Sequence, residues 1–185
     1  MLIGESLPRE IKTQRLVLRR PQRCDAAQVH ASWASDPEAA KYMSWARHTS
    51  LELTEQVIDL WLSQWEGTSG GVFLITDAVS GEVIGSTGFE LENPFVASTG
   101  YILAKQYWAK GFATEALDGI VNLARERGLQ RLFAHCHYAH EKSAHVMEKC
   151  GFAFEGRLRN YMEFPNLSPG KVTDVLLYAW IPTLA

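Results

Sequence analysis

Eight consecutive residues near the middle of the chain have the composition of a phosphate-binding site. They read Trp108-Ala109-Lys110-Gly111-Phe112-Ala113-Thr114-Glu115 and stand between a predicted strand and a predicted helix. Gly111 allows an approach to the backbone that a side chain would block, Ala113 is nearly as small, and Lys110 adds a point charge. The first N–H groups of a helix lack intrahelical partners and lie at the positive end of its dipole, where anions bind. The alternative interpretation is an ordinary turn before a helix, since glycine is common in turns.

A second run of residues lies downstream and reads His140-Glu141-Lys142-Ser143, followed by Glu148-Lys149-Cys150-Gly151-Phe152. Together the two runs resemble the GCN5-related N-acetyltransferase superfamily, and specifically its ribosomal-protein alanine N-acetyltransferase-like branch. The family's cofactor loop is Gln/Arg-x-x-Gly-x-Gly/Ala, and Gly111 and Ala113 fall on its two small positions. Trp108 departs from the Gln/Arg position, although that branch often carries a Trp-x-Lys-Gly-Tyr/Phe-Ala-Thr-Glu form. The family's Asn-x-x-Ser element corresponds to the second run, and the resemblance extends from about residue 13 to residue 181.

The resemblance implies an enzyme that transfers an acetyl group from acetyl-CoA to a primary amine by direct attack in a ternary complex. The acceptor would be the α-amine of a protein N-terminus or a small-molecule amine. The strand that ends at Ile102 and Leu103 would bind the pantetheine arm through its backbone. It would diverge from the strand at 134–138 and leave a slot for the thioester. The cofactor-binding residues that follow are Ile102, Leu103, Trp108, Ala109, Lys110, Gly111, Phe112, Ala113, Thr114, His140 and Ser143.

The departing thiolate needs a proton donor. In the superfamily this acid is often a tyrosine four positions after the serine of the second element, and here that position is Met147, which cannot donate a proton. We therefore expect Ser143 to take the role, and the same serine could also cap its helix. His140 stands where asparagine is usual. Its imidazole can still donate to a cofactor carbonyl, in a charge state that its surroundings decide.

The base that accepts the amine's proton has several candidates. Glu90 lies on a predicted strand that faces the expected acceptor groove. His135 and His137 share one face of their strand, with Cys136 on the other, and Glu163 lies near the end of a late strand. A peptide α-amine has a pKa of about 8, so it does not require a strong base. We take Glu90 and His137 as candidate catalytic residues beside Ser143.

The acceptor groove should have aromatic walls. One wall would come from the segment 33–65, and the other from Tyr161 and the loop 164–170. Tryptophans at helical spacing are mostly core residues, so Tyr42, Trp45 and Tyr161 are the candidate substrate-binding residues.

Two other classes of function remain open. The first is a CoA-binding sensor without catalysis, because the usual asparagine and tyrosine are missing while the loop is kept. The second is a metal site, because His135, Cys136, His137, His140 and His145 lie close together in the sequence. No Cys-x-x-Cys or His-Glu-x-x-His pattern supports it, and we expect no metal.

The predicted elements run as a strand, two helices, three strands, a helix, a strand, a helix and two strands. Capping boxes at Asp25 with Gln28 and at Thr49 with Glu52 predict the starts of the first two helices. Gly128 and Gly151 predict the ends of the last two. The order is not the strict alternation of a doubly wound sheet. Together with the resemblance, it predicts one mixed α/β acyltransferase domain over residues 1–185, with a core at about 13–181. Its mostly antiparallel twisted sheet would have about seven strands flanked by about four helices.

The bulk composition is that of an ordinary globular protein. Of the 185 residues 46% are apolar and 21% charged, and the formal net charge is −3. This balance lacks the basic excess of a nucleic-acid binder. We find no apolar run long enough to span a bilayer and no secretory signal. The three cysteines are an odd number, which fits reduced thiols in a cytoplasm. The fold-level analogy allows a homodimer without requiring one.

Overall fold

The computed structural model describes residues 7–66 and 70–182. It contains an eight-stranded sheet in the order β1-β2-β3-β4-β5-β6-β8-β7. The strands are β1 (Glu10–Lys12), β2 (Leu16–Arg19), β3 (Gly70–Asp77), β4 (Val83–Asn93), β5 (Val96–Leu103), β6 (Arg131–His137), β7 (Ala153–Glu163) and β8 (Val172–Trp180). The helices are α1 (Ala26–Val29), α2 (Leu51–Gln64), α3 (Phe112–Glu126) and α4 (Glu141–Lys149). The expected mixed α/β fold is therefore confirmed, with β1 as a short additional strand.

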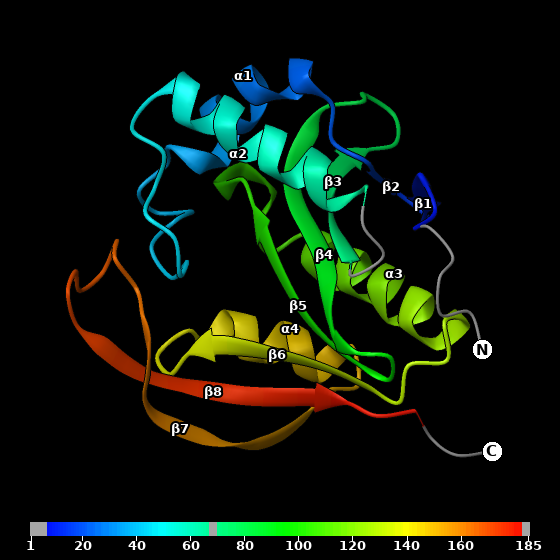
Figure 1. Cartoon of the computed structure of the whole chain (residues 1–185), viewed down its shortest axis with the longest axis vertical. Coiled ribbons are helices and arrows are strands. Elements are labelled where there is room, and N and C mark those ends of the chain that lie inside the picture. Colours follow the sequence, from blue (N-terminus) through cyan, green and yellow to red (C-terminus); the bar gives the residue numbers. More distant parts are fainter. Residues whose placement is uncertain (1–6, 67–69, 183–185) are drawn as a thin grey trace.

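The helices cover both faces of the sheet (Figure 1). Contacts join α1 and α2 to β3 and β4 on one face, while α3 packs against β2, β4 and β5 on the other. The buried residues of α3 include Ala116, Leu117, Ile120, Val121 and Ala124, which recur at helical spacing. Gly128 follows α3 with a φ of 70° and Gly151 follows α4 with a φ of 79°, as C-cap glycines do.

The first two helical regions begin differently from the prediction. Gln22 is the N-cap of a 3₁₀ turn at Arg23–Asp25, and Asp25 is its third residue, with a carboxylate that accepts the Gln22 N–H at 2.7 Å. Asp25 also pairs with Arg19 at 2.6 Å, so the neighbouring strand holds it. In the second helix the cap is Ser50 rather than the neighbouring threonine, and its Oγ accepts the N–H of Leu53 at 3.3 Å.

The strands β5 and β6 diverge, and this divergence positions the site. They are joined by the crossover helix α3 and run parallel. Within the described residues they pair only where Val96–Ser98 lies beside Arg131–Phe133. Beyond these residues β5 continues along β4 to Leu103, and β6 continues along β8 to His137. The sheet therefore splits into two halves with an opening between them (Figure 1).

Close packing of α3 on the first hairpin depends on Gly119. A Cβ at this position would lie 3.0 Å from Leu18 Cδ1 and 3.4 Å from Thr13 Cγ2. The missing side chain therefore lets the helix approach β2.

We expect Gly119→Val to lower the free energy of unfolding by about 1–3 kcal/mol, because the added methyl groups overpack this contact. Urea denaturation would measure the loss. Gly156→Val on β7 is the matched control, since a Cβ at Gly156 meets nothing within 4 Å. Equal stability of the two variants would contradict the packing argument.

Candidate active site

The opening between β5 and β6 belongs to a cavity of about 640 Å³. Part of the wall is formed by β5, β6, α4 and the residue before α4, namely by Tyr101, Ile102, Ala134, His135, Cys136, His140, Ser143 and Met147. Another part is formed by the segment before α2, by α2 itself and by the end of β7, including Tyr42, Trp45, His48, Trp61 and Met162. One continuous space therefore connects the predicted thioester slot with the predicted aromatic acceptor groove.

The predicted phosphate loop has the backbone conformation of an anion site. Gly111 is the N-cap of α3 with a φ of 82°, and Ala109 has a φ of 58°. The N–H of Glu115 donates to the carbonyl of Gly111 at 3.0 Å, which is the first turn of the helix. The N–H groups of residues 112–114 precede that bond, so they have no carbonyl of α3 to donate to. They lie at the positive end of a helix of 15 residues.

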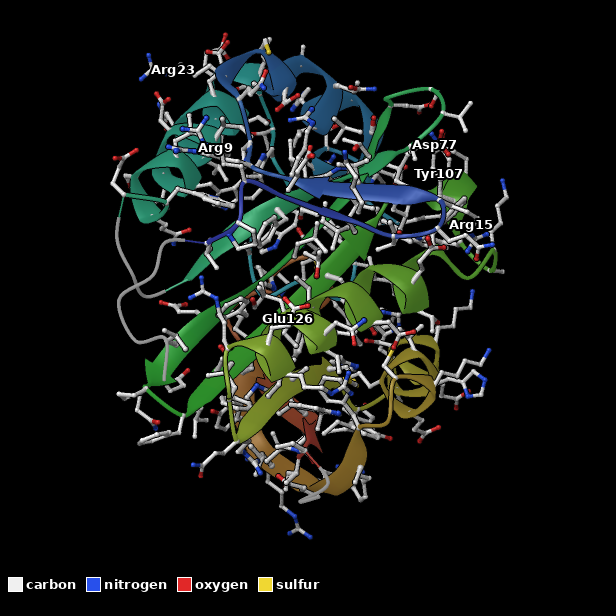
Figure 2. The ribbon with its side chains drawn as sticks, turned by 90° about the vertical axis from the view of Figure 1, so that its right-hand side faces the viewer. Arg9, Arg15, Arg23, Asp77, Tyr107 and Glu126 are labelled. Carbon is white, nitrogen blue, oxygen red and sulfur yellow. The ribbon has the colours of Figure 1, made fainter. Side chains whose placement is uncertain are left out.

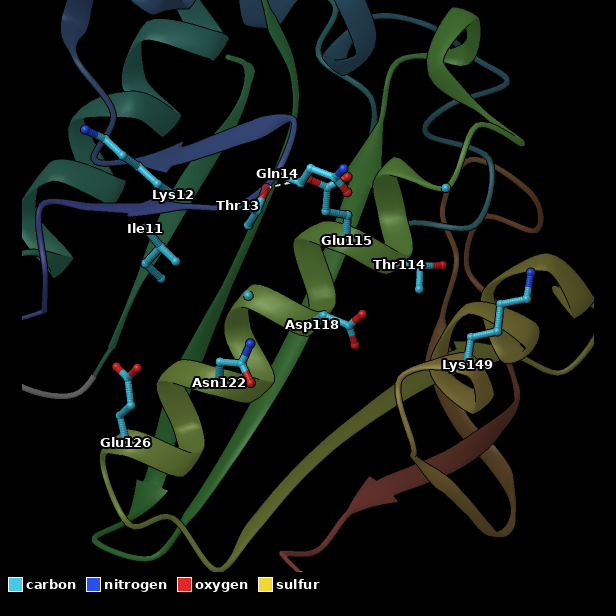
Figure 3. Close-up of a pocket in the computed structure, with 12 residues that line it drawn as sticks. Ile11, Lys12, Thr13, Gln14, Thr114, Glu115, Asp118, Asn122, Glu126 and Lys149 are labelled. Atoms are coloured by element: carbon cyan, nitrogen blue, oxygen red, sulfur yellow. Dashed lines mark hydrogen bonds between the residues drawn. The ribbon is translucent and has the colours of Figure 1, made fainter.

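Glu115 ties this loop to the first hairpin. Its Oε1 accepts the Thr13 hydroxyl at 2.6 Å and the Arg15 N–H at 2.7 Å, and its Oε2 accepts from the Arg15 guanidinium at 2.7 Å. Figure 3 shows Thr13 and Glu115 facing each other across this contact. Partial burial opposes the negative charge, but these hydrogen bonds outweigh it and hold the pKa of Glu115 below its usual value. The glutamate at the end of the loop motif is thus a structural tether.

Three cations surround the loop. Arg15 lies at the turn of the first hairpin (Figure 2) and donates to the Lys110 carbonyl at 3.0 Å. The ammonium of Lys110 lies 5.5 Å from the Tyr107 ring centroid, and the ammonium of Lys142 lies 5.5 Å from the Trp108 ring centroid. A separate cavity of about 570 Å³ on the outer side of α3 has a mixed lining, with the carboxylates of Glu115, Asp118 and Glu126 and the ammonium groups of Lys12 and Lys149 (Figure 3). The cations beside the loop would favour an anion at the start of α3.

Trp108 has a packing role. Its indole N–H donates to the Leu103 carbonyl at 2.8 Å, and its ring packs against both apolar clusters of the protein. It holds the end of β5 to the loop, so its polar group is already engaged. The neighbouring strand residue Ile102 is buried and lines the cavity.

Ser143 lies in the first turn of α4 and lines the cavity where the two strands diverge. Its Oγ is 2.9 Å from the hydroxyl of Tyr101, which also lies within donating distance of the Ser143 carbonyl at 3.0 Å. Met147 is fully buried one turn further along the helix. Both side chains line the cavity, and of the two the Ser143 hydroxyl is the one that can donate a proton.

His140 precedes α4 and stacks on Tyr42, with ring centroids 4.4 Å apart. Burial, with a smaller contribution from His137, lowers the pKa of His140 to about 4. The ring is therefore neutral at pH 7, and it can donate one hydrogen bond and accept another.

Comparison with known proteins assigns the chain to a family. The family described as acetyltransferase (GNAT) domain matches residues 15–153. The chain belongs to the GNAT acetyltransferase family. The expected enzyme class, an N-acetyltransferase acting on an amine, is thereby confirmed.

Individual relatives agree with this assignment. The uncharacterized N-acetyltransferase p20 of Bacillus licheniformis is 30% identical over 174 residues, which are 90% of this chain and 93% of the relative. Among solved structures, the microcin self-immunity acetyltransferase MccE in complex with acetyl-CoA and AMP superposes with a TM-score of 0.85. MccE is 19% identical to this chain, and the superposition covers 95% of this chain and 98% of MccE. The ribosomal-protein α-N-acetyltransferase RimL in complex with coenzyme A superposes with a TM-score of 0.81. It is 21% identical, and the superposition covers 93% of this chain and 97% of RimL. At these identities the two structures support the fold alone.

The candidate bases of this GNAT protein occupy different environments. His135 lines the cavity, and burial lowers its pKa below the ordinary value. Glu90 lines the cavity from β4 and is exposed. His137 is absent from the described lining: it packs edge-on against Phe164 at 4.8 Å, and its Nδ1 accepts the Ala139 N–H at 3.1 Å. The structure thus brings His135 and Glu90, but not His137, to the cavity.

The late candidates from β7 are placed at its end. Tyr161 is 51% exposed, and its ring lies 5.1 Å from that of His135. Glu163 accepts the Gly170 N–H at 2.8 Å. Asn166 in the following loop donates to the carbonyls of Ala40 and Trp45, at 2.7 and 2.8 Å. The two predicted walls of the acceptor groove are therefore joined directly.

Sequence reasoning missed the buried His48. Its Nδ1 lies 2.9 Å from the Thr54 hydroxyl, which is also 3.0 Å from His30 Nδ1 and within 3.4 Å of the Ser50 carbonyl. If the Thr54 hydroxyl donates to the Ser50 carbonyl, both histidine rings donate to the Thr54 oxygen through Nδ1–H. The Nε2 atom of His48 then keeps its lone pair. Burial lowers the pKa of His48. The signal in the sequence, a histidine just before a helix cap, is too weak to find it.

The described residues contain neither a metal-binding cluster nor a membrane-spanning helix. Among residues 7–66 and 70–182, no group of three or more His, Cys, Asp or Glu side chains could hold a metal ion. No helix in the described part of the chain is long and apolar enough to cross a membrane.

Gly111→Glu should abolish binding of acetyl-CoA measured by calorimetry, because it places bulk and negative charge where the pyrophosphate is expected. Gly128→Glu is the matched control. It adds the same charge at the other end of α3, at a glycine with a similar φ of 70° and open surroundings. Normal acetyl-CoA binding by a folded Gly111→Glu variant would refute the loop assignment.

Proposed function

We propose that this protein transfers the acetyl group of acetyl-CoA directly to a primary amine while both substrates are bound. The observation that carries the proposal is the single cavity, which extends from the β5–β6 opening to the aromatic segment before α2. A thioester in the opening and an amine among the aromatic residues would meet inside it. Direct attack needs such a shared space, because it gains its rate from orientation of the two reactants.

The cofactor would lie along β5 and across the start of α3. The edge of β5 beyond Ser98 has no strand beside it in the described residues and would bind the pantetheine arm. The N–H groups at 112–114 would bind the pyrophosphate, with Lys110 and Lys142 nearby as point charges. The co-crystallised acetyl-CoA of MccE and coenzyme A of RimL support this choice of cofactor.

Ser143 would serve as hydrogen-bond donor to the departing thiolate, and His135 as the base. A histidine must be neutral to accept a proton, and burial favours the neutral imidazole of His135. Glu90 would attract the protonated amine toward the cavity. These roles follow from where the side chains lie.

The dependence of kcat on pH should show the titration of His135. Because its pKa is lowered, kcat should be constant at neutral pH and fall as the pH drops through a midpoint below 6.5. His135→Gln should lose this limb and most of the rate. His145→Gln, on the exposed side of α4, should keep both the acidic limb and the wild-type rate. Measuring kcat at saturating amine removes the ionisation of the free acceptor. A wild-type limb that survives in His135→Gln would exclude His135 as the base.

The charges of the cavity indicate the class of acceptor. Among the described lining residues Glu90 is the one carboxylate, and no lysine or arginine is present. His48, His135 and His140 all have lowered pKa values, so they are neutral at pH 7. An acceptor carboxylate would enter without a cationic partner, and a polyamine would find one carboxylate. We therefore propose a monoamine or a peptide N-terminus with an apolar, preferably aromatic, group.

Two matched amines test this class. 2-Phenylethylamine and phenylalanine share the ring and the amine, and phenylalanine adds a carboxylate. We expect kcat/KM at least about tenfold higher for 2-phenylethylamine, since a buried carboxylate without a partner is costly. Thiol release from acetyl-CoA provides the assay, with spermidine as the polyamine control. A preference for phenylalanine or spermidine would contradict the proposed class.

A further inference from the structure

Tyr101 faces Ser143 across the opening between the two halves of the sheet. Its hydroxyl lies 2.9 Å from Ser143 Oγ and 3.0 Å from the Ser143 carbonyl oxygen. Tyr101 is on β5 and Ser143 is in the first turn of α4, so the contact spans the place where the thioester is expected. The fully buried Met147, by contrast, offers no proton.

We propose that Tyr101 is a positioning residue that turns the hydroxyl proton of Ser143 toward the sulfur of the thioester. The inference rests on the proposed function, in which Ser143 is the donor to the departing thiolate.

The phenol proton of Tyr101 has two acceptors within reach, the Ser143 carbonyl and the Ser143 Oγ. When Tyr101 donates to the Ser143 carbonyl, the serine proton is left to point back at the phenol oxygen. When Tyr101 donates to Oγ instead, the serine proton is free to point into the cavity. A hydroxyl that accepts a hydrogen bond also becomes a stronger donor. A sulfur in the opening therefore favours the second arrangement.

The proton balance assigns different roles to the two hydroxyls. As the C–N bond forms and the C–S bond breaks, the C–S electron pair leaves on sulfur, which takes the Ser143 proton. The proton that the amine loses to the base and solvent restores the serine, leaving an amide and a free thiol. Tyr101 keeps its own proton throughout, because burial raises its pKa well above the ordinary value. Tyr101 thus orients the donor and is not itself the acid.

The contact could instead be a structural tether, and the protein contains a control for that. Tyr178 on β8 also donates its hydroxyl to α4, at 3.1 Å from Glu148 Oε1. Tyr178→Phe therefore removes a comparable bond between the sheet and the same helix, away from the opening. Tyr101→Phe and Tyr178→Phe differ in whether the lost hydroxyl contacts Ser143.

The test measures kcat, KM for acetyl-CoA and the thermal midpoint of Tyr101→Phe and Tyr178→Phe. Each variant is made with and without Ser143→Ala. The substrates are acetyl-CoA and 2-phenylethylamine, or the fastest other amine tested. We expect Tyr101→Phe to lower kcat about tenfold, which is the scale of one hydrogen bond. KM for acetyl-CoA should change less than twofold. In the Ser143→Ala background Tyr101→Phe should have no further effect, and the alkaline side of the pH profile should not move.

Four results would overturn the inference. They are an unchanged kcat in Tyr101→Phe, an equal loss in Tyr178→Phe, an undiminished tenfold loss in the Ser143→Ala background, and an alkaline limb that disappears in Tyr101→Phe, which would make the tyrosine the acid. A wild-type protein that binds acetyl-CoA but releases no thiol with any amine would refute the proposed function, and the inference with it. That pattern is distinct from the other four, in which the wild type is active.

Discussion

The loss of pairing between β5 and β6 is the constraint on which the rest of the structure depends. Each strand is fully paired on its other side, β5 with β4 and β6 with β8. The two therefore diverge as edges of separate half-sheets once pairing ends at Ser98 and Phe133. Backbone groups along such edges need hydrogen-bond partners from elsewhere. An extended arm with its own amides, such as pantetheine, would meet that need, so the split in the sheet supports the proposed position of the cofactor.

The helices α3 and α4 then place hydrogen-bond donors at two sides of the opening. The crossover α3 must begin where β5 ends, which places its first N–H groups beside the opening. Its position is fixed from outside by Glu115, through Thr13 and Arg15. Because α4 follows β6 in the same way, its first turn brings Ser143 to the opposite edge. The proposed donors to the cofactor's pyrophosphate and to the departing thiolate would thus both arise from one topological feature.

The sequence predicted the parts of this arrangement that depend on local patterns. The ends of α3 and α4 followed from the positions of Gly128 and Gly151, and the placement of the Gly111 loop between a strand and a helix followed from its residues and the family resemblance. The caps at Gln22 and Ser50 were missed because several neighbouring polar residues can cap a helix, and tertiary partners such as Arg19 decide between them. Contacts between distant residues leave no local signal. Tyr101 with Ser143 and His30 with Thr54 are of this kind, and so is the placement of His135, rather than His137, at the cavity.

Charge is distributed so that the two substrates can be distinguished. Lys110 and Lys142 lie beside the loop, where the cofactor's phosphates are expected, whereas the lining of the cavity on the acceptor side contains Glu90 and neither lysine nor arginine among the described residues. Inside the cavity, burial keeps the histidines neutral, because the charged imidazolium is disfavoured where water is excluded. Neutral histidines cannot neutralise an acceptor carboxylate, but they can accept the proton of an attacking amine. In the proposed mechanism, the burial that lowers their pKa values would therefore serve both proton transfer and selection of the acceptor.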